Sequence, residues 1–407
     1  MRIRERLAPL LAVIGLLMLM SPPPTASAHG EKGQQAFERT STVMFYDVKF
    51  STTDVDINAP LTITGTLRVM NSWPDHTIGP PELGYLTVNE PGPVLSVQER
   101  WMSGMFTPQS VNLTKGGVYP FKIVLKGRVP GTWHVHPALA VKGTGTLMGP
   151  GEFVTVNNAG GPFTEMQQLS NGNTVDLVNY GLPRVAWWHI LGLLFGACYV
   201  WYWLRQPTLQ RLLVVNEGGA AGLVTKQERR VSVLFGIGAL AIGIGGFVYA
   251  TVSDGPRIPL QVARVTPVPE LPNSLGQGLS TTVQQAVFQE KTGTLEMTAK
   301  VTNNTDSPVT LNHLQFADYI VTNADGASAG VPKDQLATVT PTGPIAPKET
   351  REITVSLDAN ALRRQNLLPL NDAQIRLTGL MFFKDGKGQT SATEINELTS
   401  GILPQYG

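Results

Sequence analysis

Two stretches near the start of the chain alternate apolar and polar residues. Residues 61–67 read Leu-Thr-Ile-Thr-Gly-Thr-Leu, and residues 121–126 read Phe-Lys-Ile-Val-Leu-Lys. Because successive side chains of a β-strand point to opposite faces, this alternation predicts two half-buried strands. Turns rich in Gly and Pro follow at residues 91–93, 115–117 and 149–151. Residues 29–180 are therefore predicted to form an antiparallel β-sandwich of about seven short strands.

The last third of the chain repeats this pattern. Residues 295–301 alternate as Leu-Glu-Met-Thr-Ala-Lys-Val, and residues 353–357 and 380–383 are further apolar or alternating runs. Residues 256–407 are therefore predicted to form a second antiparallel β-sandwich, with a short helix within residues 357–370. Its only imidazole is His313, so we assign this domain no metal and expect a packing or assembly role.

Two uncharged apolar segments separate the predicted sandwiches. Residues 185–204 and 231–252 are each near the ~20 residues that a helix needs to cross a bilayer. Trp and Tyr residues gather at the ends of the first segment, as they do at membrane interfaces. His189 near its start is either an interfacial anchor or a contact with another subunit. Ala239 and Gly243 have the small-x-x-x-small spacing that permits close helix contact, although glycine is also simply tolerated in lipid. Residues 181–255 are thus predicted to be a two-helix transmembrane hairpin.

The connector between these segments, residues 205–230, is rich in basic residues, namely Arg205, Arg211, Lys226, Arg229 and Arg230. Since short basic loops stay in the cytoplasm, both large flanks are predicted to be extracytoplasmic, or periplasmic. The protein is then a multi-pass protein of the cell membrane, either the inner membrane or an intracytoplasmic one.

The first 28 residues have the pattern of a secretory signal peptide. Three arginines precede an apolar run over residues 7–20, and Ala26-Ser27-Ala28 matches an A-x-A cleavage site. Cleavage after Ala28 would make His29 the first residue of the mature chain. An N-terminal histidine offers an imidazole and an α-amine whose pKa of roughly 7.7 to 8.0 allows metal binding near neutral pH. Copper(II) is the divalent ion that such nitrogen ligands favour most.

His134 and His136 are the predicted partners of His29. They lie in the run Gly-Thr-Trp-His-Val-His at residues 131–136, which is typical of a strand. Residues two apart on a strand share a face, so both imidazoles point the same way. Taken alone, such a pair is often surface decoration. Together with an N-terminal histidine it predicts an all-nitrogen copper site that uses three of the chain's six histidines.

Composition limits the other functions. A formal net charge of +1 argues against nucleic acid as a partner. Cys198 is the only cysteine and lies in an apolar segment, so neither a disulfide framework nor a cysteine-based metal site is available.

The order of motifs resembles the B subunit of the copper membrane monooxygenases, the family of particulate methane, ammonia and short-chain hydrocarbon monooxygenases. The matching motifs are His-Gly-Glu-Lys-x-Gln-Gln-Ala-Phe at residues 29–37, Tyr-Asp-Val-Lys at 46–49, Glu-Pro-Gly-Pro-Val at 90–94, Gly-x-Trp-His-Val-His at 131–136, Gly-Pro-Gly at 149–151 and Thr-Val-Asp-Leu-x-x-Tyr at 174–180. The resemblance covers nearly all of the mature chain and implies two cupredoxin-like domains joined by the hairpin.

The resemblance also implies a site and a set of partners. Its copper ligands fall on His29, through amine and imidazole, and on His134 and His136. Some relatives hold another copper with histidines where this chain has Met44 and Arg68, so that site is not carried over. The family's B subunit works with membrane subunits A and C as a trimer of heterotrimers, with quinol as reductant, to insert one oxygen atom from O2 into a C–H or N–H bond. Neither the catalytic residues nor the choice among methane, ammonia and short alkanes follows from this chain.

Two other functions fit an N-terminal histidine on a β-sandwich. One is a membrane-anchored copper-binding or delivery protein without oxygenase activity, and the other is a secreted polysaccharide oxygenase. The transmembrane hairpin argues against a soluble copper carrier and against a secreted enzyme, because neither needs one.

Overall fold

The computed structural model describes residues 34–168, 174–219, 223–254, 265–270, 278–368 and 375–399. The predicted signal peptide and His29 lie outside these ranges. The chain divides into two compact units, one made of residues 1–161 and 263–407 and the other of residues 162–262. The two predicted β regions therefore belong to one unit, and the predicted membrane segments to the other.

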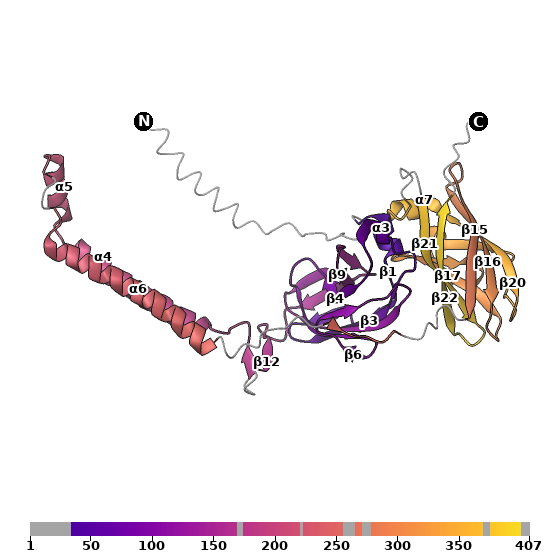
Figure 1. The fold of residues 1–407 in the computed structure, drawn as a ribbon, viewed down its shortest axis with the longest axis horizontal. Helices are drawn as coiled ribbons and strands as arrows, with labels where there is room; N and C mark the ends of the chain where they lie inside the picture. Colours follow the sequence, from indigo (N-terminus) through magenta and orange to yellow (C-terminus); the bar gives the residue numbers. More distant parts are fainter. Residues whose placement is uncertain are drawn as a thin grey trace. The chain divides into compact units, whose positions relative to one another are not determined.

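The first β region contains two sheets (Figure 1). The five-stranded sheet has the order β1 (Val43–Phe50), β3 (Pro60–Val69), β8 (Val118–Gly127), β5 (Leu95–Met102) and β6 (Met105–Phe106). The other sheet has the order β14 (Val265–Thr266), β7 (Ser110–Asn112), β4 (Leu83–Asn89), β9 (Gly131–Val141), β11 (Glu152–Asn157) and β2 (Asp54–Asp56), and β10 (Thr146–Met148) also pairs with β9. The two alternating runs of the sequence are β3 and β8, which pair antiparallel and bury Leu61, Ile63 and Ile123 completely.

Strand β14 follows the membrane segments in the chain, yet it pairs with β7 in the first β region. From the sequence these residues were predicted to lie in the second sandwich. Strand β7 lies next to the end of its sheet, where its unpaired backbone groups can accept another strand.

The second β region is one hydrogen-bonded path of eight strands, with a core of Leu, Val, Ile and Phe side chains. Its order is β15 (Leu279–Gln289), β16 (Thr294–Asn303), β20 (Thr350–Asp358), β19 (Leu336–Thr340), β18 (Tyr319–Asn323), β17 (Val309–Phe316), β21 (Ile375–Asp385) and β22 (Thr390–Thr399). The end strands β15 and β22 also contact each other, so the path curves around its core. The predicted short helix is α7 (Ala359–Arg364), and the Asp358 carboxylate caps it by accepting from Asn360 N and Ala361 N.

The two β regions share an apolar contact. Met44, Tyr46, Met70 and Val118 pack with Leu380, Phe382 and Ala392 in one buried cluster. Beside it, an ion pair joins Arg68 to Glu394, whose side chains are only 7% and 11% exposed. Each region therefore covers part of the other's apolar surface.

The second unit contains the two predicted membrane helices, α4 (Leu182–Leu204) and α6 (Lys226–Asp254), side by side (Figure 1). Both are long and apolar enough to cross a membrane. Phe195 and Tyr199 of α4 each lie 4.9 Å from Phe235 of α6, ring centre to ring centre. A Cβ atom built at Gly243 would meet nothing within 4 Å, whereas one at Gly238 would meet the Phe195 ring, so of these two glycines Gly238 lies at the close contact between α4 and α6.

The rest of this unit departs from the sequence prediction in two ways: part of the predicted loop is helical, and residues 162–180, predicted as the end of the first sandwich, belong to this unit. A third helix, α5 (Thr208–Asn216), occupies part of residues 205–230, and β12 (Met166–Gln168) pairs with β13 (Thr174–Asp176) before α4. Thr225 and Glu228 form a reciprocal capping pair at the start of α6, since each side chain accepts from the other's backbone N–H. The Thr-x-x-Glu spacing is a sequence signal for this helix start, although these residues were predicted only as part of the connector.

Candidate metal centre

Strand β9 carries the two predicted histidine ligands in the interior of its sheet. Val135, Leu139 and Val141 are buried in the apolar core, whereas His134 and His136 lie on the opposite face. The alternation of the strand places both imidazoles together, as predicted from the sequence. His136 is only 3% exposed, so it is held among neighbouring atoms.

The two imidazoles converge on one point. His136 Nε2 lies 3.1 Å from His134 Nδ1, and the ring centres are 4.3 Å apart with the planes at 76°. For metal–nitrogen bonds of about 2.0 Å, two adjacent ligand nitrogens are about 2.8 Å apart in a square-planar complex and about 3.3 Å apart in a tetrahedral one. The observed separation lies between these values, so this hydrogen-bonded pair also has the spacing of two ligands of one metal.

A backbone carbonyl sets the orientation of His136. Its Nδ1 lies 2.8 Å from the carbonyl oxygen of Gly149. A carbonyl can only accept, so Nδ1 carries the hydrogen and the Nε2 lone pair is directed toward His134. A second hydrogen bond of this kind is typical of metal-binding histidines.

The imidazole of His136 leaves no room for a side chain at residue 151. Gly151 lies against the imidazole, and a Cβ atom built there would be 2.4 Å from His136 Nδ1 and 2.5 Å from Cε1. On the other side of β9, Asn89 of β4 is the cross-strand partner of His136, and its Nδ2 donates to Met148 Sδ at 2.8 Å. Two imidazoles in a cradle closed by a glycine fit a metal that prefers nitrogen ligands.

The third predicted ligand, His29, lies outside the described residues. The nearest described part of the chain is Gln34, whose Nε2 donates to the carbonyl of Thr146 in β10. Helix α2 (Ala36–Ser41) follows. Among the described residues, no group of three or more His, Cys, Asp or Glu side chains could hold a metal.

Met44 and Arg68, at the positions where the resemblance implied histidines in some relatives, are direct cross-strand partners on β1 and β3. Met44 is fully buried, and the guanidinium of Arg68 is paired with the carboxylate of Glu394. Neither side chain has an imidazole nitrogen, and a guanidinium stays protonated and has no lone pair for a metal.

His313 lies in the second β region, as expected from the sequence. Its ring stacks on Phe382 with a centroid distance of 4.4 Å, and Asn312 Nδ2 lies 2.8 Å from its Nδ1. Burial lowers the pKa of His313, although the charge of Asp47 opposes this. Packing of its ring against Phe382 therefore explains why a histidine lies at this position.

A further titratable group lies just beyond Asn89. Burial raises the pKa of Glu90 to about 7, although hydrogen bonding from the Leu95 N–H and the charge of Arg128 oppose this. The Glu90 Oε2 atom accepts from Leu95 N at 3.0 Å. Glu90 thus holds the turn between β4 and β5.

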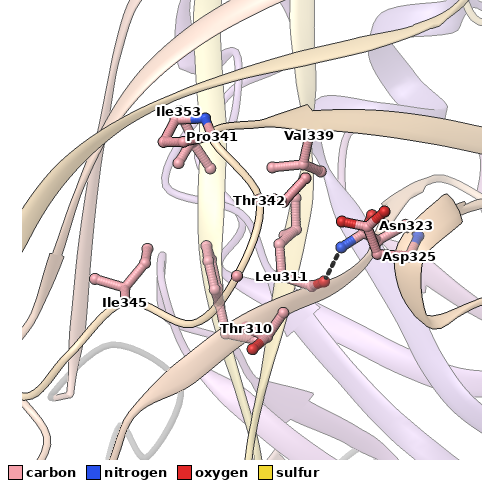
Figure 2. Close-up of a pocket in the computed structure, with 11 residues that line it drawn as sticks. Thr310, Leu311, Asn323, Asp325, Val339, Pro341, Thr342, Ile345 and Ile353 are labelled. Carbon is pink, nitrogen blue, oxygen red and sulfur yellow. Dashed lines mark hydrogen bonds between the residues drawn. The ribbon is translucent and has the colours of Figure 1, made fainter.

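A pocket in the second β region does not adjoin the imidazoles (Figure 2). Its volume is about 10 Å³, which is barely enough for one water molecule. Asn323 Nδ2 donates to the carbonyl of Leu311 at 2.8 Å, so this buried amide is bonded within the pocket wall.

Sequence reasoning identified His134 and His136 but not the residues that surround them. Gly149 and Gly151 were interpreted as turn signals and as part of a family motif, without a role at the histidines, and Phe153 and Asn89 were not singled out. Their role depends on strand register, which is visible only once β4, β10 and β11 are paired with β9.

Comparison with known protein sequences gave matches to one family. A family model described as the monooxygenase B-subunit protein matches residues 30–406. The particulate methane monooxygenase alpha subunit of Methylococcus capsulatus is 34% identical over 418 residues, which cover 99% of each chain.

Two solved structures were also matched. The cupredoxin domain of amoB from Nitrosocaldus yellowstonii is 19% identical, with a TM-score of 0.25 over 31% of this chain and 93% of that one. The adhesin InvE of Yersinia pseudotuberculosis is 9% identical, with a TM-score of 0.17 over 86% of this chain and 57% of that one. Because both TM-scores are low, the description of the fold depends on the strand pairing itself.

Proposed function

This chain belongs to the family of monooxygenase B subunits, and from that membership we propose that His134 and His136, completed by His29, bind copper. Family membership makes the chain a subunit of a monooxygenase complex, and its two candidate membrane helices agree with a membrane protein. The observation that carries the proposal is the 3.1 Å approach of His136 Nε2 to His134 Nδ1.

The length of the chain allows His29 to be the third ligand. Five residue steps separate Gln34 from His29, and an extended chain covers at most about 18 Å in that number. Thr146, to which Gln34 is bonded, pairs with Ala140, four residues along β9 from His136. That interval is about 13 Å on a strand. Removal of the predicted signal peptide, residues 1–28, would supply the free amine.

The proposed site has the donors that copper uses. Two imidazoles, with the imidazole and amine of His29, make a nitrogen-only set that supports both copper(I) and copper(II). When bound, copper would supply redox chemistry with O2. The residues of this chain would hold and orient the metal: the Gly149 carbonyl fixes the ring of His136, and the sheet keeps His134 on the same face.

We propose that the complex inserts one oxygen atom from O2 into methane, ammonia or a short alkane, with subunits A and C as partners in a trimer of heterotrimers and quinol as reductant. The name of the Methylococcus relative makes methane the first substrate to test. The two β regions precede and follow the hairpin in the sequence, yet they belong to one compact unit. This supports placing both on the same side of the membrane. The basic connector supports the periplasmic side.

The test uses the complex purified from membranes. We expect the His134→Ala/His136→Ala variant to lose one copper site, measured as copper per complex and as a lost component of the Cu(II) paramagnetic resonance spectrum. Retaining Ala28 ahead of His29 should change the same component, because a blocked amine cannot bind the metal. His76→Ala, which replaces an exposed histidine in α3 (Asp75–Ile78), is the control. Unchanged copper content and spectrum in the double variant would refute the proposal.

A further inference from the structure

The strand beside β9 is broken opposite His136 and its neighbour Pro137. Strand β10 pairs Met148 with Ala138, whereas β11 pairs Glu152 with Val135. Three residues, 149–151, therefore face only two, His136 and Pro137, so the strand contains one extra residue. Such a bulge bends a strand and redirects neighbouring groups, and bulges are common beside functional sites.

We propose that this break, together with Phe153 directly after it, positions both imidazoles: Gly151 makes room for the ring of His136, and Phe153 fixes the plane of His134. The inference rests on the proposed copper site and adds positioning residues to it. These residues would act through the two histidines and need not touch the metal.

Gly151 is required by the position of His136. A Cβ atom at residue 151 would be 2.4 Å from Nδ1 and 2.8 Å from Cγ of the imidazole, which is closer than van der Waals contact. The His136 ring could avoid this clash only by rotating about its two side-chain bonds. Any side chain would therefore push the ring away from Gly149, whose carbonyl oxygen is 2.8 Å from Nδ1. The Nε2 atom would then leave its position 3.1 Å from His134 Nδ1.

Phe153 supports the other imidazole. It is the cross-strand partner of His134, and the two rings are stacked with centroids 4.5 Å apart and planes at 25°. Phe153 is 58% exposed, so its position is not explained by filling the core. A stacked ring limits rotation of the half-exposed imidazole, which keeps Nδ1 directed toward His136.

The test compares variants of the complex purified from membranes and titrated with Cu(II) alone. Gly151→Ala should weaken copper binding at this site by roughly 100-fold, the upper range for residues that orient a ligand. Phe153→Ala and Phe153→Leu should weaken it by up to roughly tenfold and alter its resonance spectrum. Phe153→Tyr keeps the stacked ring and should restore the wild-type spectrum.

Two matched controls separate positioning from general damage. Gly145→Ala lies in the same hairpin, where a Cβ meets nothing within 4 Å, and should bind copper normally. Phe106→Ala removes a phenylalanine of similar exposure, 49%, from β6, which belongs to the other sheet of this β region. This variant should also bind copper normally. Thermal unfolding of each variant checks the fold, and the exposed Phe153 can be replaced without emptying the core.

The spectrum of this site is the difference between wild type and the His134→Ala/His136→Ala variant. If that difference is present and Phe153→Leu leaves its shape and affinity unchanged, the positioning role of Phe153 is refuted while the copper site stands. If Gly151→Ala binds copper as Gly145→Ala does, the role of Gly151 is refuted. If wild type and the double variant give the same spectrum, the copper site itself is refuted.

Discussion

At the scale of single residues, burial and hydrogen bonding decide what each polar group can do. The Gly149 carbonyl selects the hydrogen position of His136, and that selection leaves the lone pair on Nε2. Glu90 shows the opposite situation, because burial penalises its charged form and only part of that penalty is offset. Burial around Glu90 thus disfavours its carboxylate.

The raised pKa of Glu90 makes stability depend on pH. The folded state holds the proton up to about pH 7, whereas the ordinary pKa is 4.5, so stability is full below pH 4.5 and falls as pH rises toward 7. We expect Glu90→Gln to stabilise the protein by about 1–2 kcal/mol at pH 8, after allowing for partial solvent screening, and to change little at pH 4.5. Thermal unfolding at both pH values measures this. An equal shift at both would contradict the expectation, and Glu352→Gln, at an exposed carboxylate, is the control.

At the scale of elements, close contact depends on small residues in specific places. In α6 a Cβ atom built at Gly238 would be 2.6 Å from the Phe195 ring of α4, and one at Gly246 would be 3.3 Å from Trp188. These glycines let the two helices approach at the aromatic rings. The β10–β11 break uses Gly151 in the same way against His136.

Gly238→Ala should therefore separate α4 from α6. Overpacking of this kind costs typically about 1–3 kcal/mol, which thermal unfolding of the complex in detergent would show as a lower midpoint. Gly236→Ala is the matched control, because a Cβ at Gly236 meets nothing within 4 Å and alanine favours the helix. Equal midpoints for the two variants would show that the glycine contact is unimportant.

Sequence patterns predicted the elements better than their partners. The alternation in β3 and β8 and the apolar runs of α4 and α6 are local, so they were predictable. The same local parity placed His134 and His136 on one face. Helix α5 lies in a stretch without turn signals that was interpreted as a loop. The pairing of β14 with β7 and the stacking of Phe153 on His134 depend on long-range register, which no local pattern contains.

At the scale of the whole molecule, the two β regions are joined by charge as well as apolar contact. Glu394 of β22 accepts from Asn71 N and Asn71 Nδ2 and pairs with Arg68. Gln315 Nε2 of β17 donates to the Phe45 carbonyl of β1. Because Arg68, Glu394 and Gln315 are buried or half-buried, loss of one of their partners leaves a polar group without part of its compensation.

Glu394→Gln should destabilise this joint by about 3 kcal/mol, since it removes the anionic partner of a buried guanidinium. Arg68→Met combined with Glu394→Met should recover part of the loss, because both charges are then absent. Thermal unfolding measures both. Arg364→Met is the control, since its ion pair with Asp334 is 57% and 41% exposed and should contribute under about 1 kcal/mol. If Glu394→Gln lowers the unfolding midpoint no more than Arg364→Met does, the Arg68–Glu394 ion pair does not stabilise the contact between the two β regions.

The pairing of β14 with β7 has a consequence for how the protein is made. Val265 follows its partner Ser110 by 155 residues, and both membrane helices lie between them. At translation rates of about 5–20 residues per second, β7 waits roughly 8–30 s for its neighbour. During that interval the nascent first region presents an open strand edge, which is the kind of surface that pairs with other chains. A ribosome that stalls within the hairpin would leave that edge open.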